Sequence, residues 1–314
     1  LGGIYNKLGQ YKLGLDTYQQ ARTIAKNISN PELESYTLQA IAIDFVYEQG
    51  RYQPALDYLQ QVLVIEQELN NEDTVRWALT NIGIVHLNLG QFEDALKSFE
   101  DALVIAKKNN DVESMYDILH KTSFVYYNMN QDDIAMDYAQ RALEITKKIE
   151  KPRATAVVLN TVGMYYFSED NKKALEAFQQ ALAIQKEHNA QTEIGSTLNN
   201  IGHIYKDLGD YEKALDYFQQ ALKNARANRD PFAESVALSA IGTVHFDLKE
   251  YELAADYYQQ ALNGASRAGN PDIESSILAD LGDIQAEQGN ISSAIDFYKQ
   301  AVDLVESIQG DIKT

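Results

Sequence analysis

The sequence contains no cysteine, only five prolines among its 314 residues, and few basic side chains. The absence of cysteine excludes disulfide frameworks, thiolate zinc sites, iron–sulfur ligation and cysteine nucleophiles. The 27 lysines and arginines stand against 46 aspartates and glutamates, which gives a net charge of −19. A chain this acidic lacks the basic face that nucleic acids and anionic membrane surfaces require. We therefore expect no nucleic-acid partner and no membrane partner.

Long apolar runs are missing as well. No stretch approaches the ~20 residues of a membrane span, and the chain does not start with the basic and apolar segments of a signal peptide. Apolar residues make up 45% of the chain and charged residues 23%. This composition is typical of a globular protein with a packed core and not of a disordered chain. These features predict a soluble, cytoplasmic protein.

What the sequence does contain is an internal repeat of about 40 residues. A first series of small residues recurs at spacings of 40, 41, 40, 40, 39, 40 and 40: Gly2, Ala42, Gly83, Ser123, Gly163, Gly202, Gly242 and Gly282. A second series, twelve positions later in the regular units, consists of Gly14, Ala55, Ala95, Ala135, Ala174, Ala214, Ala254 and Ala294. A third series, seven positions further on, consists of Ala21, Val62, Ala102, Ala142, Ala181, Ala221, Ala261 and Ala301. Small residues at fixed places allow two antiparallel helices to approach closely, while aromatic residues at helical spacing fill the flanks.

Turn and cap residues divide each unit into two helices. Turn residues stand five before the second series at Gly9, Gly50, Gly90, Asn130, Gly209 and Gly289. Prolines 31, 152, 231 and 271 mark helix starts, because proline is favoured at the first helical position and Asn or Asp precedes three of them as a cap. We predict helix–turn–helix units at roughly 1–30, 31–70, 71–110, 111–150, 151–189, 190–229, 230–269 and 270–308, with residues 309–314 as a tail or junction. The units from 111 to 189 depart most from the pattern, through drift or because they form a hinge.

The motifs Leu1-Gly2-x-x-Tyr5, Ile201-Gly202-x-x-Tyr205 and Tyr211-x-x-Ala214, followed by Phe218 and Ala221, resemble the tetratricopeptide repeat family over essentially the whole chain. The family's usual period is about 34 residues. The longer period here is similar to that of kinesin light chains, Leu-Gly-Asn-type adaptors, bacterial peptide-sensing regulators and cyanobacterial multidomain proteins. The resemblance implies an all-α fold: a right-handed superhelix of about eight helix–turn–helix repeats, the first one truncated, in a single array over residues 1–308.

Features at both ends of the chain predict that it is a fragment of a longer protein. The first helix opens at Leu1-Gly2 without a cap, and residues 302–312 resemble the junction that precedes a caspase-like (CHAT-type) peptidase domain in cyanobacterial repeat proteins. We expect the array to be the recognition or regulatory part of a larger bacterial protein. Because its ends are uncapped, self-association of the array is an alternative.

The chain carries no motif for catalysis, phosphate binding or calcium binding. The five histidines do not form a ligand set. His86 and His245 share the register of Tyr205, where we expect them to pack as a tyrosine would, and only His120 and His203 should face the groove. We therefore expect no enzyme activity, no metal and no cofactor in this segment.

In the family that this chain resembles, first helices line the concave groove of the array. The groove positions predict a peptide-binding site made of Asn81, Asn88, His120, Phe124, Tyr127, Asn128, Asn160, Asn199, Asn200, His203, Asp207, Phe246, Asp247, Asp280 and Asp283. An asparagine amide offers a donor and an acceptor to an extended peptide. The same amides could instead bond to the neighbouring helix and fix repeat stacking. The aromatic residues of the set could likewise form ligand pockets or pack between repeats.

Charge along the groove is uneven. Residues 251–314 hold eleven acidic and three basic side chains, a net of 3 − 11 = −8, whereas residues 151–200 hold five of each. Asp207, Asp247 and Glu287 share one register at spacings of 40. This pattern favours a partner with a basic segment in the C-terminal half of the groove, and the alternative is an acidic lining screened by water.

The function predicted from these features is a protein–protein interaction module that binds a peptide or a helical segment in its groove. One alternative is the peptide-pheromone receptor domain of a bacterial signalling regulator. The other is a self-assembling structural scaffold.

Overall fold

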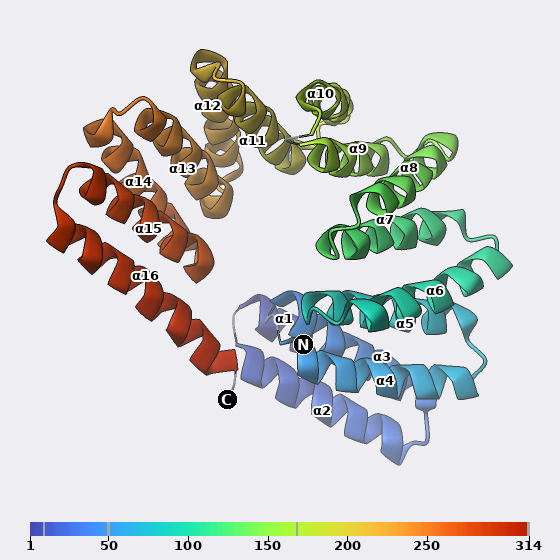
Figure 1. Cartoon of the computed structure of the whole chain (residues 1–314). Helices are drawn as coiled ribbons and strands as arrows, with labels where there is room; N and C mark the ends of the chain where they lie inside the picture. The colour runs from blue at the N-terminus through green and yellow to red at the C-terminus, as the bar shows by residue number, and fades with distance from the viewer. Residues whose placement is uncertain (9, 49–50, 168, 313–314) are drawn as a thin grey trace. The chain divides into compact units, whose positions relative to one another are not determined.

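The computed structural model describes residues 1–8, 10–48, 51–167 and 169–312. Within these ranges the chain consists of sixteen α-helices, one π-helical segment and connecting turns, with no strand (Figure 1). The all-α prediction is confirmed. The predicted turn residues Gly9 and Gly50, and the last two residues of the predicted tail, lie outside the described residues.

The chain forms two compact units, residues 1–150 and 151–314. Unit 1 contains four helical hairpins: α1 (Gly2–Lys7) with α2 (Tyr11–Asn27), α3 (Pro31–Ile43) with α4 (Tyr52–Glu68), α5 (Glu72–Asn88) with α6 (Phe92–Lys108), and α7 (Val112–Asn128) with α8 (Asp132–Lys148). The π-helical segment Asp44–Glu48 directly follows α3. The division into units falls between the predicted repeats 111–150 and 151–189.

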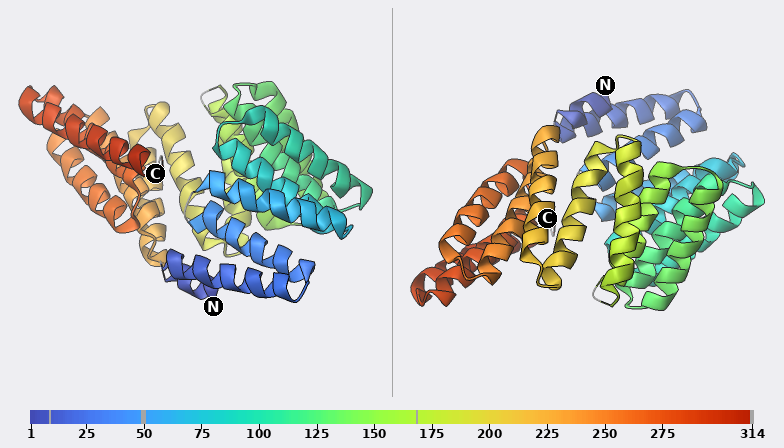
Figure 2. Two further views of the ribbon diagram at one scale, coloured as in Figure 1. Left: turned by 90° about the horizontal axis from the view of Figure 1, so that it is seen from below. Right: turned by 90° about the horizontal axis from the view of Figure 1, so that it is seen from above.

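Unit 2 repeats the same arrangement. Its hairpins are α9 (Pro152–Tyr166) with α10 (Asn171–Glu187), α11 (Gln191–Asp207) with α12 (Tyr211–Asn228), α13 (Pro231–Asp247) with α14 (Tyr251–Ala268), and α15 (Pro271–Glu287) with α16 (Ile291–Ile312). We call the first helix of each hairpin its A helix and the second its B helix. In both units the B helix of one hairpin also packs on the A helix of the next, so that the hairpins stack (Figure 2).

Helix starts and turns are where the sequence predicts them. The side chains of Asn30, Asp230 and Asn270 each accept a hydrogen bond from the backbone N–H three residues later, at 2.9, 3.0 and 3.0 Å. A proline follows each of these caps at the first helical position. The turn residues Asn130 and Gly209 have positive φ angles of 56° and 75°, the conformation that ends a helix and reverses the chain.

The first series of small residues is buried between the two helices of each hairpin. A methyl group built on Gly202 would lie 2.5 Å from the ring of Phe218, and one on Gly83 would lie 2.6 Å from the ring of Phe99. Both rings come from the B helix of the same hairpin and are 0% and 1% exposed. Glycine therefore provides the space that the buried ring occupies.

Two repeats depart from this pattern: their first-series residue is larger than glycine, and no aromatic ring stands opposite it. Where the first series has Ala42, the B-helix position of the ring holds Leu59, and where it has Ser123 that position holds Ala139. All four residues are buried. In the first of these repeats the extra methyl of Ala42 is offset by Leu59, which is smaller than a phenylalanine, as close packing of the interior requires.

The two repeats of irregular length have local structural causes. Ala42 and Ala55 are 13 residues apart instead of the usual 12, and the π-helical segment Asp44–Glu48 lies within that interval. A π-helical turn accommodates one extra residue without shifting the helix ends. Gly163 and Ala174 are only 11 apart, and α9 is correspondingly shortened to 15 residues.

Candidate functional site

The predicted site residues all lie on A helices. Within unit 1, α5 contacts α7, and within unit 2, α11 contacts α13 and α13 contacts α15. Adjacent A helices therefore present a continuous row of side chains, which we call the A surface of each unit. We describe the A surface of unit 1 first.

Three asparagines of unit 1 bond within their own helices. The amide nitrogens of Asn81, Asn88 and Asn128 each donate to the carbonyl four residues earlier, at 2.8, 2.8 and 2.7 Å. Asn81 is buried, whereas Asn88 and Asn128 are exposed. The latter two amides are therefore accessible to a ligand.

His120 and Phe124 form an aromatic pair on α7. Their ring centroids are 4.9 Å apart with planes tilted by 57°. Burial lowers the pKa of His120 to about 4, so the imidazole is neutral at pH 7. Tyr127, one turn from Phe124, is 40% exposed. The pair offers apolar and hydrogen-bonding surface but no positive charge.

The A surface of unit 1 also holds a cavity of about 240 Å³ between α3, α5 and α7. Its lining consists of Ile43, Arg76, Trp77, Thr80, Asn81, Ile84, Ser114, Asp117, Ile118 and Lys121. Arg76 pairs with Asp111 at 3.2 Å, and Lys121 pairs with Asp117. Of this lining, only Asn81 belongs to the predicted site.

Sequence reasoning missed Arg76 and Trp77 because the predicted groove positions begin three residues before the first series. These two residues lie four positions before Thr80 and Asn81, one helical turn earlier on the same face. Including the positions one helical turn before the predicted groove positions would have identified both residues.

In unit 2, Asn160 binds a neighbouring repeat. Its amide nitrogen donates to Thr197 Oγ1 at 2.8 Å, and the Thr197 hydroxyl lies 3.1 Å from Asn160 Oδ1. This pair links α9 to α11, as the repeat-stacking alternative predicts. Asn199 is only 7% exposed, and its Oδ1 has no hydrogen-bond partner among the described residues. Asn200 is half-buried beside it.

His203 packs edge-on against the buried ring of Phe218, with centroids 5.0 Å apart and planes at 68°. Burial lowers the pKa of His203, which keeps this imidazole neutral as well. One turn further along α11, Asp207 Oδ1 lies 3.5 Å from the Lys206 ammonium. The nearby lysine partly offsets the negative charge at this end of α11.

The acidic residues of α15 differ in exposure. Asp280 is half-buried, and burial together with the nearby Asp283 raises its pKa to about 6. Asp283 accepts a hydrogen bond of 2.6 Å from the Tyr298 hydroxyl, while Asp247 on α13 is exposed. The carboxylate of Asp280 therefore lies in surroundings that disfavour its negative charge.

Tyrosines of the B helices reach this acidic part of the A surface. The Tyr251 hydroxyl donates to Glu287 at 3.3 Å, and the hydroxyls of Tyr258 and Thr243 are 3.0 Å apart. The ring of Phe246 packs against Tyr251 with centroids 5.7 Å apart. Their helical spacing in the sequence predicts only that these tyrosines pack in the core. The partners of their hydroxyl groups depend on how the A and B helices of a hairpin pair.

His245 packs against an aromatic ring of the neighbouring B helix. His245 stacks on Tyr257 with centroids 5.3 Å apart and planes at 6°, as Tyr205 stacks on Tyr217 at 5.5 Å and 11°. The prediction that His245 replaces a packed tyrosine is confirmed. In the part of the chain that the structure describes, no three His, Asp or Glu side chains are placed to hold a metal ion. Within the same residues, no helix is long and apolar enough to cross a membrane.

A sequence profile of the tetratricopeptide repeat matches residues 1–68, 44–108, 114–187, 193–267 and 233–307. The chain belongs to the tetratricopeptide repeat family. The predicted resemblance is thereby confirmed across nearly the whole sequence. No protein among those with curated functions matches the sequence significantly.

Several solved structures of tetratricopeptide repeat proteins share the fold. A Rap protein in complex with competence and sporulation factor has a TM-score of 0.67 at 18% identity, covering 96% of this chain and 85% of that one. A STAND signal-transduction ATPase with a tetratricopeptide repeat sensor, from Pyrococcus horikoshii, has a TM-score of 0.65 at 22% identity. The match covers 96% of this chain and 47% of the ATPase. Putative kinesin light chain repeats from Podosopora anserina have a TM-score of 0.51 at 18% identity, covering 60% of this chain and 93% of that one. At these identities the likeness establishes the fold alone.

Proposed function

We propose that this chain is a protein–protein interaction module, with no enzymatic activity of its own, that binds a peptide or a helical segment on its A surfaces. The observation that carries the proposal is the contact between successive A helices, which places amides and carboxylates of one register in rows. A peptide lying across such a row meets a similar group at each repeat. We place this module in the cytoplasm, as the recognition part of a larger bacterial protein.

Hydrogen bonds and apolar contacts would share the binding energy. Each hydrogen bond contributes only ~0.5–1.5 kcal/mol net, so several amides must act together. Asn88 and Asn128 are exposed in unit 1. The 240 Å³ cavity beside Trp77 offers a place for one side chain of the ligand, between apolar and charged residues of its lining, and such buried anchors usually dominate binding.

The charge of unit 2 favours a partner with a basic segment. Asp247 and Asp283 are exposed carboxylates of adjacent A helices, and the half-buried Asp280 on α15 has a raised pKa. A lysine or arginine side chain placed here would offset the repulsion between the carboxylates. The same side chain would favour the ionised form of Asp280.

The test uses a fluorescent peptide of alternating lysine and alanine, with a glutamate–alanine peptide as its counterpart, and measures binding by anisotropy at rising salt. The lysine peptide should bind, and its affinity should fall with salt. The double variant Asp247→Asn/Asp283→Asn should bind roughly three- to tenfold more weakly, because each partly exposed charge pair contributes ~0.2–1 kcal/mol.

The matched control is Asp256→Asn/Asp296→Asn, which removes the same charge from exposed positions of the B helices α14 and α16. This control should bind as the parent does. Equal affinities of the two double variants would show that net charge, and not the A surface, attracts the peptide.

A receptor for short free peptides is a second candidate. It is favoured by the fold shared with a Rap conjugation gene regulator solved in complex with the Phr* peptide, which matches 90% of this chain with a TM-score of 0.66 at 16% identity. In the STAND ATPase, the tetratricopeptide repeats are described as a sensor within a longer protein. The sequence on either side of this segment distinguishes the two settings, since a DNA-binding or effector domain would indicate a signalling receptor.

Self-association is the third candidate. The last B helix, α16, exposes Ile291, Ile295 and Val302, at 59%, 45% and 54%. Light scattering at several concentrations tests this candidate. A mass that stays monomeric throughout would exclude the scaffold.

A further inference from the structure

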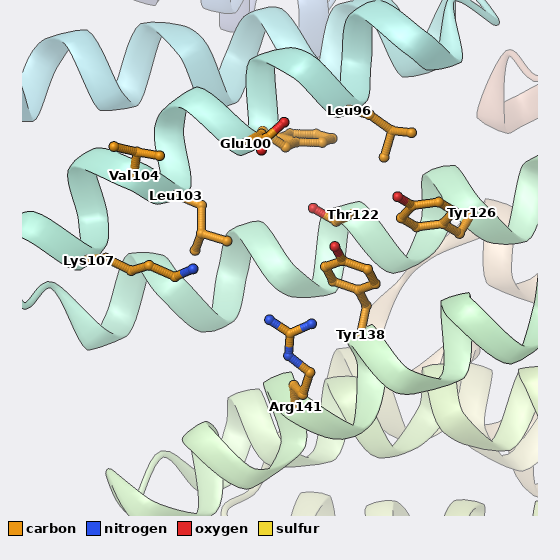
Figure 3. A pocket seen from close by; sticks show the side chains of 10 residues that line it. Leu96, Glu100, Leu103, Val104, Lys107, Thr122, Tyr126, Tyr138 and Arg141 are labelled. Atoms are coloured by element: carbon orange, nitrogen blue, oxygen red, sulfur yellow. The ribbon is translucent and has the colours of Figure 1, made fainter.

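A second cavity lies in unit 1 between the B helices α6 and α8, over the A helix α7. Its volume is about 310 Å³, and its lining consists of Leu96, Phe99, Glu100, Leu103, Val104, Lys107, Thr122, Tyr126, Tyr138 and Arg141. The side chains of Lys107 and Arg141 both turn toward its interior (Figure 3). The volume is at the small end of the range for small-molecule sites, roughly 300–1,000 Å³.

Equivalent hollows occur in two other repeats, where an internal carboxylate neutralises the cations. Between α2, α3 and α4, Glu34 accepts from Arg22 at 3.1 Å and from Lys26 at 3.3 Å. Between α12, α13 and α14, Glu234 pairs with Arg226 at 2.9 Å and with Arg267 at 3.4 Å. Both glutamate side chains are only 16% exposed.

The glutamates and the cations occupy fixed places in the repeat. Glu34 and Glu234 both stand eight residues before the first series (42 − 34 and 242 − 234). Lys26 and Arg226 both stand twelve residues after the second series (26 − 14 and 226 − 214). The ion pair is therefore a recurring feature that joins one B helix to the next A helix.

The hollow between α6 and α8 keeps the cation but lacks the glutamate. Lys107 stands twelve after Ala95, and the place of the glutamate, eight before Ser123, holds Met115. Lys107 has no ion pair among the described residues. Arg141 adds a second cation from α8, with its guanidinium 4.7 Å from the centroid of Tyr138 and 3.2 Å from Asp137.

We infer that this cavity binds a small organic carboxylate with an apolar body, whose anionic group takes the place that Glu34 and Glu234 occupy in the other repeats. The carboxylate would lie between Lys107 and Arg141, and charge-assisted hydrogen bonds of this kind are about twice as strong as neutral ones. Leu96, Leu103 and Val104 supply apolar wall for the body of the ligand.

The remaining polar groups of the cavity suit a ligand that is anionic at one end only. Glu100 also lines it, so a second negative charge on the ligand would be repelled there. Tyr126 and Tyr138 stack with centroids 5.2 Å apart, and Thr122 is buried beside them. Burial raises the pKa of the Tyr126 phenol above its ordinary value, so the hydroxyl keeps its proton throughout the neutral and mildly alkaline range.

The test measures binding of 4-phenylbutyrate and of the matching alcohol, 4-phenylbutan-1-ol, by calorimetry on the whole chain. The acid should bind at least tenfold more tightly than the alcohol, and rising salt should weaken only the acid. Lys107→Met and Arg141→Met should each weaken the acid at least tenfold. Met115→Glu should abolish binding, because it restores the internal carboxylate of the other repeats.

Lys186→Met is the matched control. Lys186 also stands twelve after the second series, and in its repeat the glutamate's place holds the apolar Ile194. The position that corresponds to Arg141 holds Gln220. This variant should bind the acid as the parent does. Absence of binding by the acid, equal binding of acid and alcohol, or full binding by both cavity variants would overturn the inference.

Discussion

Replacing Gly202 with alanine tests the packing that defines each hairpin. The added methyl would lie 2.5 Å from the Phe218 ring, whereas ordinary contacts begin at 3.4 Å, so the ring must move by 3.4 − 2.5 = 0.9 Å. Phe218 is fully buried, and close-packed interiors resist such a shift. The substitution should therefore strain the contact between α11 and α12.

Two effects of opposite sign determine how far Gly202→Ala changes the free energy of unfolding. Overpacking a core destabilises a protein by ~1–3 kcal/mol. Replacing glycine with alanine inside a helix stabilises the folded protein by up to ~1 kcal/mol. Because the buried ring leaves no room to relax, we expect a net destabilisation of about 1–2 kcal/mol. The midpoint of urea unfolding, followed by circular dichroism, measures it.

A second variant in the same helix separates packing from helix propensity. A methyl on Gly195 would meet only the end of the Asn224 side chain, at 3.0 Å. Gly195→Ala should therefore leave stability unchanged or raise it by up to ~1 kcal/mol. If Gly202→Ala proved as stable as Gly195→Ala, the proposed reason for glycine in the first series would be wrong.

The pair Ala42 and Leu59 suggests how the strain can be relieved. Phe218→Leu should destabilise the parent by leaving a cavity, yet it should be tolerated better in the Gly202→Ala background, where the added methyl fills part of that space. We expect a coupling energy of at least ~1 kcal/mol between the two substitutions in a double-mutant cycle. Simple additivity of the two changes would contradict the volume compensation between Ala42 and Leu59.

Two further variants address buried polar groups. The pKa of Asp280 is about 6 in the folded protein, against an ordinary value of 3.8. The folded state therefore favours the protonated carboxyl, and the stability that this preference contributes is present below pH 3.8 and is lost as the pH rises through 6. Asp280→Asn should thus stabilise the protein by about 1–2 kcal/mol at pH 7.5, after allowance for partial exposure. At pH 3.5 the same substitution should leave stability unchanged. An effect of equal size at both pH values in urea unfolding would contradict this. Gln185 is 2% exposed and neither of its side-chain polar atoms has a partner among the described residues. Gln185→Met, of similar volume, should raise stability by ~1 kcal/mol, and a lower unfolding midpoint would refute that expectation.

Much of the candidate surface could be located from the repeat register alone. The register places Asn88, Asn128 and Asp247 on A helices, where the structure shows them exposed. It does not distinguish these residues from Asn160, whose amide is taken by Thr197 of the next A helix. Positions on a helix follow from periodicity, but the partner across a helix–helix contact depends on how the two helices meet.

The sequence by itself determined the hairpins, their boundaries and the series of small residues, because helical period, caps and turns are local properties. Only the tertiary structure decided what those residues contact. It pairs Gly202 with Phe218, brings the Tyr298 hydroxyl to Asp283, and leaves Lys107 facing a cavity where other repeats have a glutamate. These relations join different helices, and side-chain volume and charge in three dimensions, not spacing along the chain, determine them.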